Sequence, residues 1–418
     1  MKLYILFLIL MVWSGISAQN WVQLDSNTSV NLNAVTFNDI NTGIAVGDNG
    51  TILRTVNGGE QWELIPSNTS SHLKDVSFSN QNVVLAVGYG PTILRSANSG
   101  ESWEEISVAG LNYDLLSVSL HSSGNGIAGG FAQTILRTED HGQNWDVVQT
   151  DYFGGGFWGA YMTSNNIGFV AGENSIFQPL VGRTLNAGSS FGFYAFYLED
   201  NGNYHEGRLY DCYFFDDISG FTVAARWDGW GCITHTTNLS NWISSHYPDP
   251  IFSIDFHGND GYVVGGSGLI KYTSNSGGEW EDDWSGYSVD LNGVDVQENA
   301  VYAVGDNGYI LKKNLGTVVD KNNIPQSITF LSAYPNPYTG ENNRNKGITI
   351  SFNLKIPGRI KLDLFNIQGK FLDILLQDDF GAGEYTISWD IDPYPPGIYL
   401  YRLQTENSSR VHKIIKLK

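Results

Sequence analysis

The stretch that decides the fold is Leu32 to Trp62, LNAVTFNDINTGIAVGDNGTILRTVNGGEQW, because its pattern returns along the chain. Close copies run from Leu73 to Trp103 and from Leu115 to Trp145, and Ile251 to Trp280 repeats the pattern again. Leu291 to Lys313 repeats only its first three segments. Self-similarity at a period of about forty residues indicates a stacked or radial array of similar units.

Each copy predicts four β-strands and no helix. In the first copy an alternating run, Ala34–Phe37, precedes Gly43–Gly47, and a third strand follows at Thr51–Arg54. The Asp-Asn-Gly turn at 48–50 favours a hairpin, because its central residues must adopt positive φ. The fourth strand begins at Trp62. All-strand units at this period predict an all-β propeller.

The turn between the third and fourth strands carries a motif of its own, Ser/Thr-x-Asx-x-Gly-x-x-Trp. It begins at Thr55, Ser96, Thr138 and Thr273. A copy at Thr184 ends in Phe191 in place of tryptophan, and a copy at Thr236 is one residue short. The Asx side chain can bond the turn backbone and glycine supplies the unusual φ. The motif resembles the Asp-box of sialidase-type and related propellers, which implies a structural role.

The last repeat has no such turn and no fourth strand, and the N-terminus supplies a match. Asn20-Trp-Val-Gln-Leu24 corresponds to Gln61-Trp-Glu-Leu-Ile65. We therefore expect a seven-bladed β-propeller over residues 19–316, closed by the N-terminal strand. With the Gly-Asp-Asn-Gly-x-Ile-Leu-Arg-Thr stretch at 47–55, the repeats resemble the photosystem II assembly and stability factor family. The resemblance implies the fold and a binding role, and it does not imply photosynthesis.

The first eighteen residues and the charge describe the compartment and exclude some partners. Residues 1–18 combine an early lysine, an apolar run and a small residue, which predicts a secretory signal peptide cleaved between Ala18 and Gln19. No other stretch is long and apolar enough for a transmembrane helix. A formal net charge of −20 argues against nucleic acid or an anionic membrane as the main partner.

The two cysteines, Cys212 and Cys232, fall by repeat register on the first and third strands of one blade. Strands two apart lie about 9–10 Å from each other, which exceeds the reach of a disulfide. We expect two free, buried cysteines.

The repeats stop after Gly316. Residues 317–330 read as a polar linker, and 331–418 predict a small Ig-like β-sandwich. Its expected strands are Ile348–Leu354, Ile360–Phe365, Tyr385–Trp389 and Ile398–Leu403.

Short motifs in this second domain resemble the C-terminal (type A) sorting domain of the type IX secretion system. They are Tyr-Pro-Asn-Pro with Pro335, Asn336 and Pro337, the Pro-Gly-Ile-Tyr stretch with Gly397, and the basic end with Lys413, Lys416 and Lys418. The resemblance implies a bacterium of the Bacteroidetes group and recognition by the type IX secretion machinery. It also implies removal of the domain, followed by release or attachment at the outer-membrane surface. An ordinary adhesion module is the alternative, but it does not explain the basic terminal strand.

Two sets of residues in the propeller are candidates for binding. The first is a ring of cations at one repeat position, namely Arg54, Arg95, Arg137, Arg183, Lys271 and Lys312, with His235 at the same place in the fifth blade. Such a ring could bind an acidic partner, because guanidinium groups form bidentate contacts with carboxylates. The interpretation we favour pairs each cation with an acidic group of its own or a neighbouring blade.

The second set lies in the irregular, aromatic-rich sector from Asp151 to Cys232. Its sharpest feature is the loop Arg226-Trp-Asp-Gly-Trp-Gly231, in which Trp227, Asp228 and Trp230 stand together, and Trp158 is a further candidate. Loops that break a regular scaffold tend to carry function. Flat aromatic rings beside a carboxylate suit sugar rings or an apolar peptide. The alternative is that these aromatics fill the core between two large blades.

No standard catalytic, metal-binding or cofactor motif is present, and eight histidines are scattered without ligand spacing. Three hypotheses follow. The leading one is a non-enzymatic module that binds a protein or a glycan. The second is a sialidase-like or related propeller glycoside hydrolase, which paired carboxylates with a raised pKa in a central cleft would favour. The third is a structural component of the cell surface or matrix.

Overall fold

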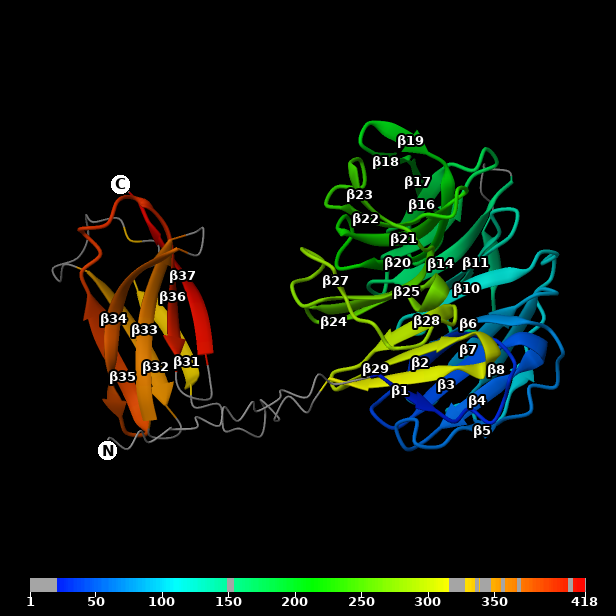
Figure 1. Cartoon of the computed structure of the whole chain (residues 1–418), viewed down its shortest axis with the longest axis horizontal. Coiled ribbons are helices and arrows are strands. Elements are labelled where there is room, and N and C mark those ends of the chain that lie inside the picture. The colour runs from blue at the N-terminus through cyan, green and yellow to red at the C-terminus, as the bar shows by residue number, and fades with distance from the viewer. Residues whose placement is uncertain are drawn as a thin grey trace, which may run out of the picture. The chain divides into compact units, whose positions relative to one another are not determined.

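The computed structural model describes residues 21–148, 154–315, 328–334, 338, 347–354, 358–366, 370–404 and 409–417. The chain divides into two compact units, Met1–Gly316 and Thr317–Lys418 (Figure 1). The predicted signal peptide, with Ala18 and Gln19, and positions 317–327 of the predicted linker lie outside the described residues.

The first unit contains seven antiparallel four-stranded sheets among its described residues. Sheet one consists of β2 (Leu32–Phe37), β3 (Gly43–Gly47), β4 (Ile52–Thr55) and β5 (Glu63–Leu64). Sheet two consists of β6 (Leu73–Phe78), β7 (Val84–Gly88), β8 (Thr92–Ser96) and β9 (Glu104–Glu105). Sheet three consists of β10 (Leu115–Leu120), β11 (Gly126–Gly130), β12 (Ile135–Thr138) and β13 (Asp146–Val148). Sheet four consists of β14 (Gly156–Met162), β15 (Gly168–Glu173), β16 (Pro179–Thr184) and β17 (Gly192–Ala195). Sheet five consists of β20 (Gly207–Phe214), β21 (Gly220–Arg226), β22 (Gly231–Thr236) and β23 (Trp242–Tyr247). Sheet six consists of β24 (Ile251–His257), β25 (Asp260–Gly265), β26 (Ile270–Thr273) and β27 (Glu281–Asp282). Sheet seven consists of β28 (Leu291–Val296), β29 (Ala300–Gly305), β30 (Ile310–Asn314) and β1 (Val22–Leu24).

The sheets follow one another around a closed ring, as in a propeller. Their first strands contact each other in the order β2, β6, β10, β14, β20, β24, β28 and back to β2. Figure 1 shows the consequence, with the yellow strands of the last sheet beside the blue strands of the first. The first strands therefore surround the centre of the unit.

The ring is closed by the N-terminal strand, as predicted. β1 pairs antiparallel with β30, and Val22 lies opposite Lys312. The preceding residue, Trp21, is buried and packs edge-on against Tyr262, with ring centroids 6.1 Å apart. Its indole Nε1 donates a hydrogen bond to Asp283 Oδ2 over 3.2 Å. The first strand of the chain is thus fixed to its last two sheets.

Five of the seven second strands, namely β3, β7, β11, β25 and β29, end in a glycine that lies very close to the backbone of the neighbouring strand. A Cβ added to Gly47 would lie 2.1 Å from the carbonyl oxygen of Asn31, and one added to Gly88 would lie 2.3 Å from that of His72. These are backbone atoms, so no side chain of any size fits. The repeated Gly-x-Ala-Val-Gly pattern therefore records a close approach of two strands.

The predicted turns are confirmed in detail. Asn49 and Gly50 both have positive φ, at 54° and 69°. In the turn after β4, Thr55 Oγ1 accepts a hydrogen bond from Gly59 N, and Asn57 Oδ1 accepts one from Gln61 N. We call the turns of this kind, between the third and fourth strands of sheets one to six, the Asx turns. Each fixes the fourth strand against its sheet.

Both cysteines lie where the repeat register places them. Cys212 is on β20 and Cys232 is on β22, the first and third strands of sheet five. Both are buried and free. The same irregular sector contains an additional hairpin, β18 (Leu198–Asp200) and β19 (Asn203–His205), outside the seven sheets.

The second unit contains two antiparallel sheets with a common core. One holds β31 (Ile328–Tyr334), β32 (Ile348–Leu354) and β35 (Gly383–Trp389), and the other holds β34 (Phe371–Phe380), β33 (Gly358–Asn366), β36 (Gly397–Gln404) and β37 (Ser409–Lys416). Buried Phe352 of the first sheet joins Leu362 and Tyr401 of the second in that core.

The four strands predicted in this unit are confirmed, and the last strand, β37, carries the basic end that includes Lys413 and Lys416. β31, whose first three residues fall in the predicted linker 317–330, was not predicted, and neither was β34. β34 is an edge strand with a mostly exposed pattern and three aspartates, so it lacks the apolar alternation that marks a buried strand. Pro335, Asn336, Pro337 and Lys418 lie outside the described residues.

We expect closure by β1 to contribute strongly to stability. Replacing Trp21 with alanine should lower the free energy of unfolding by about 3–5 kcal/mol, because it empties a buried site and removes the bond to Asp283. Val22→Ala on the same strand, where the side chain is 55% exposed, should change it by no more than about 0.5 kcal/mol. Urea unfolding of both variants measures this difference, and equal effects would contradict the role assigned to Trp21.

Candidate functional site

The predicted binding residues fall on opposite faces of the propeller unit. Arg54 and its equivalents end the third strands, beside the Asx turns, whereas Trp227, Asp228 and Trp230 lie in the turn between β21 and β22. In an antiparallel sheet the turn after the second strand and the turn after the third are at opposite ends. The structure therefore does not bring the arginines and the tryptophans together.

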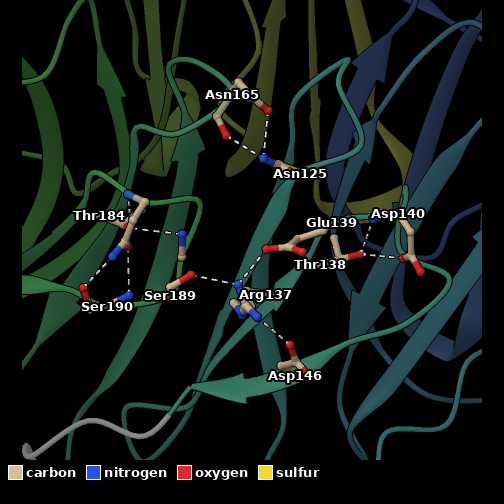
Figure 2. Close-up of polar contacts among 12 residues, drawn as sticks. Asn125, Arg137, Thr138, Glu139, Asp140, Asp146, Asn165, Thr184, Ser189 and Ser190 are labelled. Carbon is tan, nitrogen blue, oxygen red and sulfur yellow. Dashed lines mark hydrogen bonds and ion pairs between the residues drawn. The ribbon is translucent and has the colours of Figure 1, made fainter.

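Most cations of the ring join their own sheet to the next one. Five of them donate a hydrogen bond to a turn of the following sheet: Arg54 Nε to Ser99 O (2.8 Å), Arg95 Nε to His141 O (3.0 Å), Arg137 Nη1 to Ser189 Oγ (2.8 Å), Arg183 Nη1 to Asp217 O (2.9 Å) and Lys312 Nζ to Gly58 O (2.7 Å). Figure 2 shows Arg137 reaching Ser189 in this way. Ser99, His141 and Gly58 occupy one position of the Asx turn and all have positive φ, which turns their carbonyl groups toward the preceding sheet.

Most of these cations also have a carboxylate partner, as predicted. The ion pairs are Arg54–Glu101 (3.3 Å), Arg95–Glu104 (3.3 Å), Arg137–Glu139 (2.8 Å), Arg137–Asp146 (2.9 Å), Arg183–Asp217 (3.7 Å) and Lys271–Asp282. Arg95 is 8% exposed. Their contacts are those of residues that hold neighbouring sheets together, and a ligand role for the four arginines stays a prediction.

On the opposite face, Arg208 links two of the predicted tryptophans. Its Cζ lies 4.1 Å from the ring centroid of Trp158 and 5.2 Å from that of Trp227. Arg208 also donates from Nε and Nη2 to the carboxylate of Glu173, over 3.0 and 3.4 Å. Burial raises the pKa of Glu173 although Arg208 acts to lower it. The guanidinium group of Arg208 is thus bound to the buried carboxylate of Glu173 and contacts the indole rings of Trp158 and Trp227.

Further aromatic rings continue this arrangement over four successive sheets. Tyr89, Phe131, Phe177 and Trp227 each belong to the turn between the second and third strands of sheets two to five. Phe131 packs edge-on against Trp158 with centroids 5.5 Å apart, and Phe177 packs edge-on against Trp227 at 5.3 Å. Tyr89 contacts Phe131 at 6.4 Å. We call Tyr89, Phe131, Trp158, Phe177 and Trp227 the aromatic arc.

Trp230 lies next to the arc and is held by a second arginine. Arg226 Cζ lies 6.0 Å from the Trp230 ring centroid, and Arg226 binds the carboxylate of Asp228 and, over 3.5 Å, that of Asp200. Burial acts to raise the pKa of Asp228, but the hydrogen bonds from Arg226 and Trp230 N and the nearby positive charge together lower it. Trp227 and Trp230 are 53% and 44% exposed. The loop is therefore ordered by internal ion pairs while much of both rings faces solvent.

A repeated β-bulge aims one side chain of every sheet at the centre. In five of the first strands the pairing register shifts between the first and the third residue. In β14 it shifts between the second and the fourth residue, and in β20 between the third and the fifth. Bulges re-aim the side chains around them. The residues within these shifts line a central cavity of about 130 Å³: Asn33, Lys74, Leu116, Trp158, Tyr210, Phe252 and Asn292. We call them the rim residues, and Trp158 belongs to both the rim and the aromatic arc.

Two carboxylates, Asp75 and Asp211, form part of the same cavity wall just below the rim. Desolvation raises the pKa of Asp75 to about 8 and that of Asp211 to about 6. Both oxygens of each carboxylate accept hydrogen bonds: Asp75 from Val76 N (2.8 Å) and Val118 N (2.7 Å), and Asp211 from Cys212 N (2.8 Å), Ser253 Oγ (2.9 Å) and Ile254 N (3.1 Å). Proton uptake here is therefore favoured by burial and opposed by backbone donors.

The bonds from Val118 N to Asp75 and from Ile254 N to Asp211 belong to a set that connects neighbouring first strands around the central cavity, which we also call the channel. Aspartate and serine side chains accept from a backbone N–H of the next first strand: Asp75 from Val118, Ser77 from Leu120, Ser119 from Met162, Asp211 from Ile254, Ser253 from Val294, Asp255 from Val296 and Asp295 from Phe37. Burial also raises the pKa of Asp255 and Asp295. We call these contacts the channel rungs.

Several residues of this face were missed from the sequence. Asp75 and Asp211 stand where other copies of the first strand have Ala34, Ser117 or Gly293, so an acidic residue at a small-residue position was an available signal. Arg208 lies in the degenerate sector and has no counterpart that would single it out. Among the described residues, no group of three or more His, Cys, Asp and Glu side chains could hold a metal ion, and no helix is long and apolar enough to cross a membrane.

Comparisons with known proteins support this picture of two different parts. Residues 14–110 and 60–157 match the family model described as photosynthesis system II assembly factor YCF48, and residues 332–417 match that of the secretion system C-terminal sorting domain. No curated protein matches the chain. The chain therefore carries YCF48-like repeats and a sorting domain, which marks a secreted protein of the cell surface or the extracellular space.

Solved structures show the fold of the larger part. YCF48 from Cyanidioschyzon merolae is 19% identical with a TM-score of 0.56, covering 72% of this chain and 100% of its own. A complex of YCF48 bound to D1 peptide is 19% identical with the same TM-score, covering 71% and 97%. PorZ of the type-IX secretion system of Porphyromonas gingivalis is 12% identical with a TM-score of 0.52; the match covers 92% of this chain and 59% of PorZ. The propeller-like fold of the first unit follows from these likenesses.

The channel carboxylates predict a stability that falls as the pH rises. The folded-state pKa of Asp75 lies above its unfolded value, so the folded protein binds more protons between about pH 4 and pH 8. The free energy of unfolding should then decrease by roughly 1–3 kcal/mol from pH 5 to pH 8. Asp75→Ser should make this decrease smaller, because serine at the equivalent Ser253 keeps a rung without titrating.

Urea unfolding at pH 5, 6.5 and 8 measures the decrease for both proteins. Glu105→Gln, at an exposed position of β9, is the matched control and should retain the full pH dependence. A pH dependence that is the same with and without Asp75 would contradict the assignment.

Proposed function

We propose that this chain is an exported seven-bladed β-propeller that binds a glycan on its aromatic face and has no catalytic activity. The seven sheets are its blades, and the second unit is an Ig-like sandwich that delivers it through the type IX secretion system. Sorting then depends on the Pro335–Pro337 motif, Gly397 and the terminal lysines, and the signal peptide is removed after Ala18. A bacterium of the Bacteroidetes group is the expected source.

The observation that carries the binding role is the contact of Arg208 with both Trp158 and Trp227, fixed by buried Glu173. Holding a large exposed ring in one orientation lowers the entropy that a ligand must overcome on binding. A structural core has no need for this arrangement, because Trp227 remains 53% exposed after all its contacts are made. The site is thus ordered in advance and left open.

The chemistry around the rings favours a neutral glycan. Indole faces stack on the apolar faces of sugar rings, and a carboxylate such as that of Asp228 accepts hydrogen bonds from hydroxyl groups. Asp200 and Asp228 both pair with Arg226 beside Trp230, and Arg208 pairs with Glu173, so the two nearby arginines already bind carboxylates. An anionic ligand would be repelled here. A peptide is the other possible ligand class, since YCF48, which has a similar fold, is known bound to D1 peptide.

Retention of the purified full chain on immobilised neutral glycans tests this proposal. Trp227→Ala combined with Trp230→Ala should reduce retention at least tenfold, because both exposed rings are lost. Trp284→Ala is the matched control, since Trp284 is 80% exposed but lies outside the aromatic arc, and it should leave retention unchanged. Loss of retention in the control as well would show non-specific binding. Retention on peptides alone would replace the glycan with a protein ligand, and no retention on either would favour a structural role.

A glycoside hydrolase is the second candidate, and one observation favours it. Asp75 and Asp211 have a raised pKa and share the central cavity, as an acid catalyst requires. Their oxygens, however, are occupied by backbone N–H groups and a serine hydroxyl. The mass of the glycans recovered from the retention experiment separates the two functions. Shortened products that disappear with Asp75→Ser would identify the protein as a hydrolase.

A further inference from the structure

The seams between neighbouring sheets, beside the Asx turns, differ in how they are filled. Arg54, Arg95, Arg137 and Arg183 each extend across a seam to the next sheet. Three seams have another residue in this place, namely His235, Lys271 and Lys312, and two of these three contain a cavity. The seam of His235 contains a cavity of about 220 Å³, and the seam of Lys312, where the last sheet meets the first, contains one of about 210 Å³. We call the latter the closure pocket.

Lys312 is the cation of the closure pocket, and its charge is poorly compensated. In the described part of the chain no carboxylate forms an ion pair with it, whereas Arg54, Arg95, Arg137, Arg183 and Lys271 all have one. Its Nζ donates to Gly58 O over 2.7 Å and lies 5.3 Å from the ring centroid of Tyr302. Burial lowers the pKa of Lys312, while Glu60 acts to raise it from a distance. The ammonium group retains donors for an incoming acceptor.

Amide side chains supply most of the remaining polar wall. The amide residues that line the closure pocket are Asn41, Asn57, Gln297, Asn299 and Asn314. Asn299 Oδ1 is buried and has no hydrogen-bond partner. A buried acceptor without a donor costs free energy. Several side-chain amides together are suited to binding the hydroxyl groups of a sugar, because an amide group, like a hydroxyl group, both donates and accepts hydrogen bonds.

We propose that the closure pocket binds a sugar acid, with its carboxylate on Lys312 Nζ and its hydroxyl groups on the amide side chains of the wall. The carboxylate gives Lys312 the counter-ion that the equivalent cations find within the protein. The volume of about 210 Å³ is below the range of drug-sized sites and limits the ligand to a single small ring. This site is separate from the aromatic arc, on the opposite face, and does not depend on the function proposed above.

Isothermal titration calorimetry of the purified full chain tests the proposal with glucuronate, glucose and acetate as probes. Glucuronate should bind at least tenfold more tightly than either of the others, because only it supplies both the charge and the hydroxyl groups. Glucose binding as tightly would overturn the role of Lys312, and acetate binding as tightly would overturn the role of the amides. A uronate tetramer distinguishes a glycan terminus from a free sugar acid as the source of the same chemistry.

Two substitutions at one residue separate the pocket from a simple surface charge. Lys312→Gln removes the charge, and Lys312→Arg keeps it but extends a guanidinium across the seam, as Arg54 does natively. Both should weaken glucuronate binding at least tenfold. Undiminished binding by Lys312→Arg would overturn the pocket as the site.

Lys271→Gln is the matched control, because Lys271 occupies the same repeat position but is paired with Asp282. It should bind glucuronate like the unaltered protein, and so should Trp227→Ala with Trp230→Ala. Thermal unfolding of each variant verifies the fold. Arginine is the native residue at four positions equivalent to 312, so we expect Lys312→Arg to fold. Equal loss of binding in the Lys271 control would overturn the assignment to Lys312.

Discussion

Every first strand of the ring has one edge without a β-sheet partner, and the rest of the structure depends on how that edge is satisfied. In a continuous sheet the next strand would accept its backbone N–H groups. Here the next strand belongs to another sheet, so Asp75, Ser119, Asp255 and Asp295 supply the acceptors from their side chains. The aspartates among these acceptors are buried around the central cavity, and this burial raises their pKa values. The acidic channel is a consequence of closing the ring.

The seams on the Asx-turn side solve the complementary problem with opposite charge. Arg54 and Arg95 bind carbonyl oxygens that positive-φ residues turn toward them, so one guanidinium replaces a strand-to-strand bond. Neighbouring sheets are thus connected at the channel by acceptor side chains and at the seams by donor side chains. With both connections fixed, the bulged rim residues and the turns after the second strands are free to differ between repeats. Trp158 and Trp227 occupy those freer positions.

How much could be read from the sequence follows from what repeats and what does not. The four strands of each copy, the Asx turns and the place of Trp21 are copied or matched between repeats, so comparing copies was sufficient to predict them. The rungs were not predicted because acceptors alternate between Asp75 and Ser253, which hides a common role behind two residue types. The contact of Arg208 with Trp158 and Trp227 joins segments of two sheets in the degenerate sector. No spacing within one repeat encodes such a contact.

The pairing of β1 with β30 has a consequence for how this protein is exported. β1 is synthesised first and must wait for its partner, which lies near the end of the propeller sequence; Trp21 and the Asp283 it bonds are 262 positions apart. Until then the ring is a chain of sheets with two exposed ends, which are templates for aggregation. The bond between the two ends therefore acts as a test of completeness. A truncated or stalled chain fails it and stays open, and only a full set of repeats can conceal both ends at once.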